Sequence, residues 1–227
     1  MIGEVHDRNR AKDMRMPILW SFRRCPYAMR ARLAIDASQQ HVKLREILLR
    51  DKPDRFIAVS PKATVPVLQC DDGKVIEESR DIMFWALDRN DPEGWLDIWR
   101  QSPADVTVFL DRLDGSFKTD LDRYKYASRY DADAALKHRD AGVVFIAELD
   151  NILAHKPALS GNKLGVLDFA CLPFIRQFRI ADSMWFDEQN WPALHKWLHA
   201  FLTSSRFETV MQKYSPWHEG EQGVDFP

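Results

Sequence analysis

The chain has 227 residues, of which 45% are hydrophobic and 29% are charged, and its formal net charge is −2. This length and composition predict a globular protein with one large domain or two small ones. The balanced charge gives no overall attraction to nucleic acid or to an anionic membrane, so neither is an expected partner. No apolar run approaches the roughly 20 residues that cross a bilayer. Residues 1–15 also contain no apolar leader segment, so we expect a cytoplasmic protein.

The first ninety residues predict strands that alternate with helices. Residues 18–21 are an apolar strand, and a helix begins near Cys25, where Pro26 suits the first helical turn. Residues 42–44 alternate as a second strand, and Pro53 opens a short segment that ends at residues 60–61. Two strands around the turn at residues 71–73 predict an antiparallel hairpin, and a helix follows it. The predicted order is β-α-β-α-β-β-α.

From about residue 90 onward the sequence shows only helical periodicity. Apolar residues recur on one face of three segments, within residues 106–121, 167–178 and 194–201. We therefore predict two domains, residues 1–92 and residues 93–227, of which the second is all helical. The residues from Pro216 onward are expected to form a polar tail with a few aromatic anchors.

The three cysteines are Cys25, Cys70 and Cys171. An odd number of widely spaced cysteines without a CxxC pair argues against a disulfide framework and favours a reducing compartment. Cys70 ends a predicted strand and Cys171 lies on an apolar helical face, so both are expected to be buried structural thiols. Cys25 stands at a helix N-terminus, where unpaired N–H groups and the helix dipole favour a thiolate. Four nearby arginines add positive charge, namely Arg23, Arg24, Arg30 and Arg32. We therefore expect a lowered thiol pKa, against the alternative of a small buried side chain.

Four short segments together resemble one known family. They are CPYAMRARLAI at residues 25–35, DKPDRF at 51–56, TVPVL at 64–68 and EES at 77–79. With the order β-α-β-α-β-β-α followed by helices, the chain resembles the glutathione transferase superfamily, and most closely its cysteine-type, omega-like classes. The resemblance covers almost the whole chain. It implies an α/β thioredoxin-like N-terminal domain followed by an all-α C-terminal domain.

The resemblance also implies a glutathione site. In the resembling enzymes, Glu78 and Ser79 would hold the γ-glutamyl ammonium and carboxylate, and Val65, before a cis-proline, would pair with the cysteinyl backbone. Lys52 would reach the glycyl carboxylate as a point charge. Taken singly, these residues could be an ordinary helix cap, a turn and a solvated lysine. Their agreement with one ligand favours the binding site.

Three aromatic residues are candidates for the second-substrate pocket. Phe117 and Tyr124, seven residues apart on a predicted helix, would share a face, and Trp217 of the tail would close the pocket. The basic and aromatic run that contains the first two could suggest nucleic acid, but aspartates are interleaved with its bases. Two further features are assigned to structure. His195 and His199 have metal-ligand spacing but no third ligand, so no metal is expected. In the resembling enzymes a Ser or Thr stands where this chain has Gly165, three residues before a buried Asp168 that caps a helix, so we expect the glycine to weaken this cap without affecting function.

The predicted function is that of a glutathione-dependent thiol transferase, with Cys25 as the single nucleophile and glutathione as the co-substrate. Its second substrate would be a small disulfide, an oxidised molecule of the dehydroascorbate type or another electrophile, and the resemblance implies a homodimer without a metal or organic cofactor. One alternative is a conjugating transferase that activates the thiol of glutathione with a hydroxyl, for which Ser21 is the nearby candidate. The other is a binding or regulatory protein that keeps the fold without catalysis.

Overall fold

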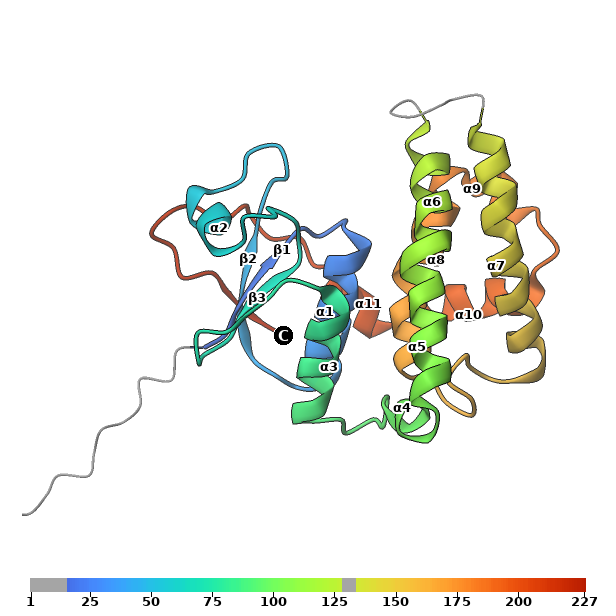
Figure 1. Cartoon of the computed structure of the whole chain (residues 1–227), viewed down its shortest axis with the longest axis horizontal. Coiled ribbons are helices and arrows are strands. Elements are labelled where there is room, and N and C mark those ends of the chain that lie inside the picture. The colour runs from blue at the N-terminus through green and yellow to red at the C-terminus, as the bar shows by residue number, and fades with distance from the viewer. Residues whose placement is uncertain (1–15, 128–133) are drawn as a thin grey trace, which may run out of the picture.

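A computed structural model describes residues 16–127 and 134–227 of the chain. The first part is a mixed sheet with helices on both faces, and the second part is a bundle of helices beside it (Figure 1). The predicted fold, a thioredoxin-like domain followed by an all-helical one, is confirmed. The elements of the first part are β1 (Ile18–Ser21), α1 (Pro26–Ala37), β2 (Val42–Glu46), α2 (Asp54–Val59), β3 (Val67–Gln69), β4 (Val75–Ile76) and α3 (Ser79–Arg89).

The sheet has the strand order β4-β3-β1-β2-β5. β1 and β2 are parallel, with Leu19 opposite Leu44, whereas β3 runs antiparallel to β1 and β4 antiparallel to β3. Helices α1 and α3 cover the face toward the helical part, and α2 lies on the other side (Figure 1). A short loop, residues 22–25, connects the carboxyl end of β1 to the N-terminus of α1.

The helical part packs around a long buried helix, α8, whose first residues are capped by an internal hydrogen-bond network. Its elements are α4 (Asp97–Gln101), α5 (Pro103–Arg112), the π-helical turn η1 (Leu113–Phe117), α6 (Lys118–Lys125), α7 (Ala135–His155), α8 (Val166–Ala181), α9 (Ser183–Asp187), α10 (Pro192–Leu202) and α11 (Ser205–Val210). α8 contacts α1, α5, α6 and α10, so it joins the bundle to the first part of the chain.

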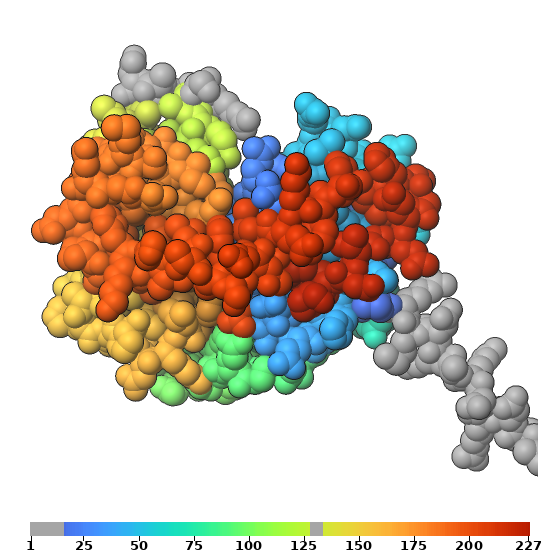
Figure 2. All heavy atoms as spheres, turned by 180° about the vertical axis from the view of Figure 1, so that it is seen from behind, coloured from blue at the N-terminus to red at the C-terminus, as the bar shows by residue number. Residues whose placement is uncertain are grey.

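The C-terminal segment has buried aromatic anchors, as expected, in Trp217 and Phe226, but it also adds a strand that the sequence did not indicate. After α11 the chain returns to the first part, where β5 (Val224–Phe226) pairs antiparallel with β2 and forms an edge of the sheet. Trp217 is only 5% exposed, and its backbone N–H donates to the carbonyl of Glu46 over 2.7 Å. Seen from behind, this segment lies over the sheet part of the molecule (Figure 2). The last residues of the chain therefore belong structurally with the first part rather than with the helices.

The boundary predicted after residue 92 falls between α3 and α4. Residues 1–15, in which the sequence shows no apolar leader, lie outside the described residues, as do the last three residues of the basic and aromatic run, 128–130. Within the described ranges, no helix is both long enough and apolar enough to cross a membrane.

Candidate functional site

A cavity of about 560 Å³ opens where the N-termini of α1 and α3 meet the loop before β3. All five residues predicted for catalysis and glutathione binding line it, and the side chain of Asp114 in η1 reaches it from the helical part. The predicted residues in its wall are Cys25, Lys52, Val65, Glu78 and Ser79. The four sequence segments that resemble the family are far apart in the chain, and the fold brings a residue of each to this one cavity.

Cys25 is the N-cap residue of α1, in extended backbone conformation, and Pro26 occupies the first helical turn, as predicted. The side chain is partly buried, and its Sγ donates to the carbonyl oxygen of Val65 over 3.6 Å. The cap side chain makes no hydrogen bond of the usual capping kind to the first turn. The N-terminus of α1 is therefore not closed by its own N-cap side chain.

The thiol of Cys25 differs from the thiolate expected at this position. Burial raises the pKa of Cys25, and it outweighs the N–H groups of Ala28 and Tyr27 and the charges of Arg32 and Lys118, which lower it. The sequence argument counted the helix terminus and the arginines correctly as favouring thiolate, but it could not include the cost of removing the charge from water. The expectation of a lowered pKa in the free protein is therefore wrong in direction.

Val65 and Lys52 both follow the thiol in the sequence, and they lie in different loops. The Val65–Pro66 peptide bond is cis, as predicted, and Val65 is 8% exposed in the cavity wall. Lys52 is half-buried in the loop between β2 and α2. Ala63, also in the wall, adopts a positive φ of 52°, an uncommon conformation for alanine. Such departures concentrate at functional sites, which supports this loop as part of one.

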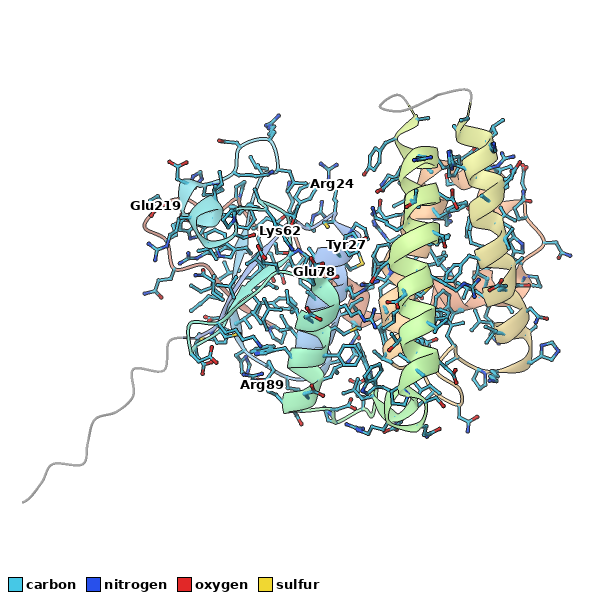
Figure 3. The ribbon with its side chains drawn as sticks, in the orientation of Figure 1. Arg24, Tyr27, Lys62, Glu78, Arg89 and Glu219 are labelled. Atoms are coloured by element: carbon cyan, nitrogen blue, oxygen red, sulfur yellow. The ribbon has the colours of Figure 1, made fainter. Side chains whose placement is uncertain are left out.

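Glu78 and Ser79 stand at the start of α3 and differ in their surroundings. Glu78 is the N-cap residue, and its exposed carboxylate accepts a hydrogen bond from the ammonium group of Lys62 over 3.2 Å (Figure 3). Ser79 is only 3% exposed, and its Oγ accepts a hydrogen bond from Nη1 of Arg30 over 3.3 Å. For Glu78 to hold the ammonium group of a ligand, that ligand must compete with Lys62.

Asp114 and Tyr27 are among the residues of the cavity wall that sequence reasoning missed. Arg30, which is 1% exposed, donates to both oxygens of Asp114 over 3.0 and 2.7 Å while it also holds Ser79. Its guanidinium group also lies 4.6 Å from the ring centroid of Phe174 in α8. Arg30 therefore joins the start of α3 to the helical part. A buried arginine requires hydrogen-bond acceptors, but the sequence does not indicate which groups supply them.

The structure does not bring the three predicted aromatic residues to this cavity. Phe117 is 2% exposed and packs on Phe145, and the ring of Tyr124 packs on Phe178, so both belong to the helical core. Trp217 packs on Trp20 beneath the sheet and lines a different hollow, of about 620 Å³, beside α2. Glu219 of that hollow lies far from Tyr27 (Figure 3). Among the described residues, the wall beside Cys25 contains none of these three. The prediction was wrong for the two helical residues because apolar helical faces look alike in a core and in a pocket.

The other residues considered from the sequence, the two further cysteines, Ser21 and His195, have contacts that belong to the fold. Cys70 and Cys171 are buried free thiols, as predicted. Ser21 ends β1 with no exposed surface, and its Oγ accepts a hydrogen bond from Arg32, so this hydroxyl is already occupied. The ring of His195 packs against Phe186. Among the described residues, no group of three or more histidine, cysteine or acidic side chains could hold a metal ion.

Comparisons with known proteins agree with this geometry. Residues 19–94 match the family model of the glutathione S-transferase N-terminal domain, and residues 137–200 match that of the C-terminal domain. The chain is 25% identical to the glutathione S-transferase DHAR2 of Arabidopsis thaliana, over 83% of this chain and 84% of that protein. It is 24% identical to glutaredoxin 2 of Escherichia coli strain K12, over 77% and 88%. The crystal structure of glutathione transferase Omega 3C from Trametes versicolor superposes with a TM-score of 0.73 at 17% identity, covering 88% of this chain and 90% of that one.

A thioredoxin-like sheet, a helical bundle and matches to both domain models define the class: the chain belongs to the glutathione S-transferase family. It is an enzyme of that family, a glutathione-dependent transferase. The cavity of Cys25 is the candidate for its active site.

Proposed function

We propose that this transferase is a thiol transferase in which Cys25 is the nucleophile and glutathione binds along Lys52, Val65, Glu78 and Ser79. One observation carries the proposal: the Cys25 sulfur, at the start of α1, shares one cavity with the whole predicted glutathione set. The likeness to DHAR2 and to glutaredoxin 2 supports it.

The proposed reaction uses one thiol and two molecules of glutathione. The Cys25 thiolate attacks the glutathione sulfur of a mixed disulfide, so a Cys25–glutathione disulfide forms and the other thiol leaves. A second glutathione thiolate then attacks the glutathione sulfur of this adduct, which regenerates the Cys25 thiolate and releases glutathione disulfide. No metal or organic cofactor enters either step.

Val65 connects binding to the charge on the thiol. In the free protein its carbonyl accepts the hydrogen of Cys25 Sγ, which stabilises the neutral thiol. In the proposed complex the cysteinyl N–H of glutathione donates a hydrogen bond to this carbonyl oxygen in place of the thiol. The thiol then loses an acceptor, while the N–H groups of Ala28 and Tyr27 remain beside the sulfur to stabilise a thiolate. The nucleophile therefore forms when glutathione or a glutathionylated substrate is bound.

The conjugating alternative requires a hydroxyl that stabilises the thiolate of glutathione. Ser21 is buried and already hydrogen-bonded to Arg32, which disfavours it. Tyr27 lines the cavity, but burial raises the pKa of its hydroxyl, and the negative charge of Asp114 raises it further. Cys25 is therefore the better-placed group.

The proposal is tested by incubating the protein with oxidised glutathione and measuring its intact mass and peptide masses. We expect retention on a glutathione resin and one glutathione adduct on Cys25 that is removed by reduced glutathione. Retention without an adduct, together with conjugation of an electrophile such as a chloronitrobenzene, would support the conjugating enzyme. Retention with neither activity would support the binding or regulatory protein.

The homodimer and the cytoplasmic location belong to the same proposal. The homodimer follows from the family resemblance, and the location from the free thiols Cys25, Cys70 and Cys171, which suit a reducing compartment. Sedimentation equilibrium would measure the association state, and fractionation of cells would locate the protein.

A further inference from the structure

A group of cationic side chains lies where the loop before α1 meets helices α6 and α8. We call it the cationic cluster; its members are Arg24, Lys118, Lys125 and Arg176. Lys118 and Lys125 are seven residues apart on α6, Arg176 lies on α8, and Arg24 directly precedes Cys25. The Nζ atom of Lys118 lies 5.3 Å from the ring centroid of Tyr27, which lines the cavity of the thiol.

Gln177 of α8 connects the cluster to the residue before the nucleophile. Its side-chain Nε2 donates to the carbonyl of Arg24 over 3.2 Å, and its Oε1 accepts a hydrogen bond from the ammonium group of Lys125. Gln177 is only 5% exposed, so this bridge is a fixed part of the interface between α8 and the loop before α1. Arg24 and Tyr27 both lie on the part of the first domain that faces the helices (Figure 3).

Most of this positive charge has no carboxylate partner. Lys118 forms an ion pair with Asp122. In the described ranges, no carboxylate lies within 4 Å of Arg24, Lys125 or Arg176; the two arginines lie instead over the rings of Phe22 and Phe207.

The members of the cluster also affect one another. Burial lowers the pKa of Lys125, and the positive charges of Arg176, Arg24 and Lys118 lower it too, against the opposing charge of Asp122. Burial likewise lowers the pKa of Arg176, and the charge of Arg23 adds to that effect. Like charges held together beside a reactive thiol repel one another, and an anionic ligand would relieve that repulsion.

We propose that the cationic cluster binds the second substrate and selects an anionic one, namely a small mixed disulfide of glutathione whose other half carries a carboxylate or sulfonate. This inference rests on the proposed thiol transfer. Attack of the Cys25 thiolate on the glutathione sulfur breaks the disulfide, and the anionic half leaves as a thiolate that then takes a proton from water. The cluster stabilises both the bound anion and the negative charge that develops on the leaving sulfur.

The experiment compares three mixed disulfides of glutathione that differ in one terminal group. Their other halves are 2-mercaptoethanesulfonate, 2-mercaptoethanol and cysteamine, which are anionic, neutral and cationic. Each kcat/KM is divided by the uncatalysed rate of the same disulfide with free glutathione, which removes differences in intrinsic reactivity. We expect the sulfonate to exceed the cysteamine compound by about tenfold or more, and the ratio to fall as ionic strength rises.

The double variant Lys125→Gln/Arg176→Gln tests the cluster itself. Its ratio of sulfonate to cysteamine should fall toward one, whereas Lys74→Gln, which removes one positive charge from the exposed β3–β4 turn, should keep the wild-type ratio. A wild type that turns over all three compounds with equal normalised kcat/KM would overturn this inference and leave the thiol transferase standing. A wild type inactive on all three would overturn the thiol transferase. Because the wild-type ratio decides by itself, the inference can be tested even if the variant fails to fold.

Discussion

The N-termini of α1 and α8 both lack a hydroxyl at the N-cap position, and their polar groups are arranged differently. At α8, the carboxylate of Asp168 accepts hydrogen bonds from three backbone N–H groups and from the indole of Trp197, over 2.8 to 3.0 Å. At α1, the side chain of Cys25 makes no usual cap bond and donates instead to Val65. The first arrangement satisfies its groups internally and serves stability. The second leaves helix N–H groups beside a thiol, which suits a site that must stabilise a transient negative charge.

Cys25→Ser should have the largest effect on activity. A serine hydroxyl remains protonated at neutral pH and cannot form a disulfide with glutathione, so thiol transfer should be lost completely. Glutathione affinity should survive because the other residues of the cavity are unchanged, and conjugation of an electrophile should persist or rise. Both activities are measured side by side on the wild type and the variant.

The matched control is Cys70→Ser, which removes a thiol at the end of β3 that the structure places away from the cavity. It should keep its thiol transfer. Thiol transfer that persisted in Cys25→Ser would remove Cys25 as the nucleophile and would favour the conjugating enzyme or another thiol.

Asp168→Ala should give the largest loss of stability. Asp168 has no exposed surface, and its removal leaves four donors, three of them in buried hydrogen bonds, without their acceptor. We expect a loss of roughly 3 to 5 kcal/mol in the free energy of unfolding, measured by urea denaturation. Asp182→Ala is the control, since that exposed cap accepts from Trp185 alone and should cost only about 1 kcal/mol. Equal losses in the two variants would contradict the comparison of the two helix ends.

Ser79→Ala should weaken glutathione binding more than it weakens folding. The loss of one hydrogen bond to a charged ligand group should reduce the binding free energy by roughly 1.5 to 3 kcal/mol. Calorimetry with S-methylglutathione measures this affinity without disulfide chemistry. Ser38→Ala is the control, because that buried serine donates to Ile35 at the far end of α1. Unchanged affinity with a lowered melting temperature would make Ser79 a residue of the fold only.

The pH dependence tests the thiol directly. Because burial raises the pKa of Cys25, the thiolate is the minor form at neutral pH, and kcat/KM should rise about tenfold per pH unit up to that pKa. Thiolate absorbance of the wild type, with Cys25→Ser as the blank, measures the same ionisation in the free protein. An inflection below the ordinary value of about 8.5 would show that the helix terminus and the arginines outweigh burial.

The sequence predicted what depends on local chemistry. Pro26 after an apolar strand was enough to place Cys25 at the start of α1, and the cis-proline at Pro66 was identified from its segment. The features it could not predict depend on distant partners. β5 is three residues long, and its pairing with β2 joins positions more than 170 residues apart, so it leaves no periodic signal. The place of Asp114 in the cavity depends on its pairing with Arg30, and the pKa of Cys25 depends on the burial that such contacts create.

Ser160 offers the finest test of the capped helix end. The sequence suggested that Gly165 weakens the cap of α8, but the Oγ of Ser160 accepts the N–H of Leu167 over 3.1 Å and supplies the hydroxyl from another position. A Cβ at Gly165 would lie 3.0 Å from Ser160 and 3.1 Å from the carbonyl oxygen of Trp95. A serine side chain at this position would therefore not fit beside Ser160 without a shift.

Ser160→Ala should therefore lower the free energy of unfolding by about 0.5 to 2 kcal/mol, the usual cost of a lost N-cap. Ser102→Ala is the matched control: Ser102 is the N-cap of α5, but its side chain makes no cap bond, so its loss should cost less. Gly165→Ser should fail to stabilise the wild type, because the added Cβ meets Ser160. Urea denaturation of the three variants compares these outcomes. If Ser160→Ala were no worse than Ser102→Ala, or if Gly165→Ser stabilised the protein, Ser160 would not be the group that completes this cap.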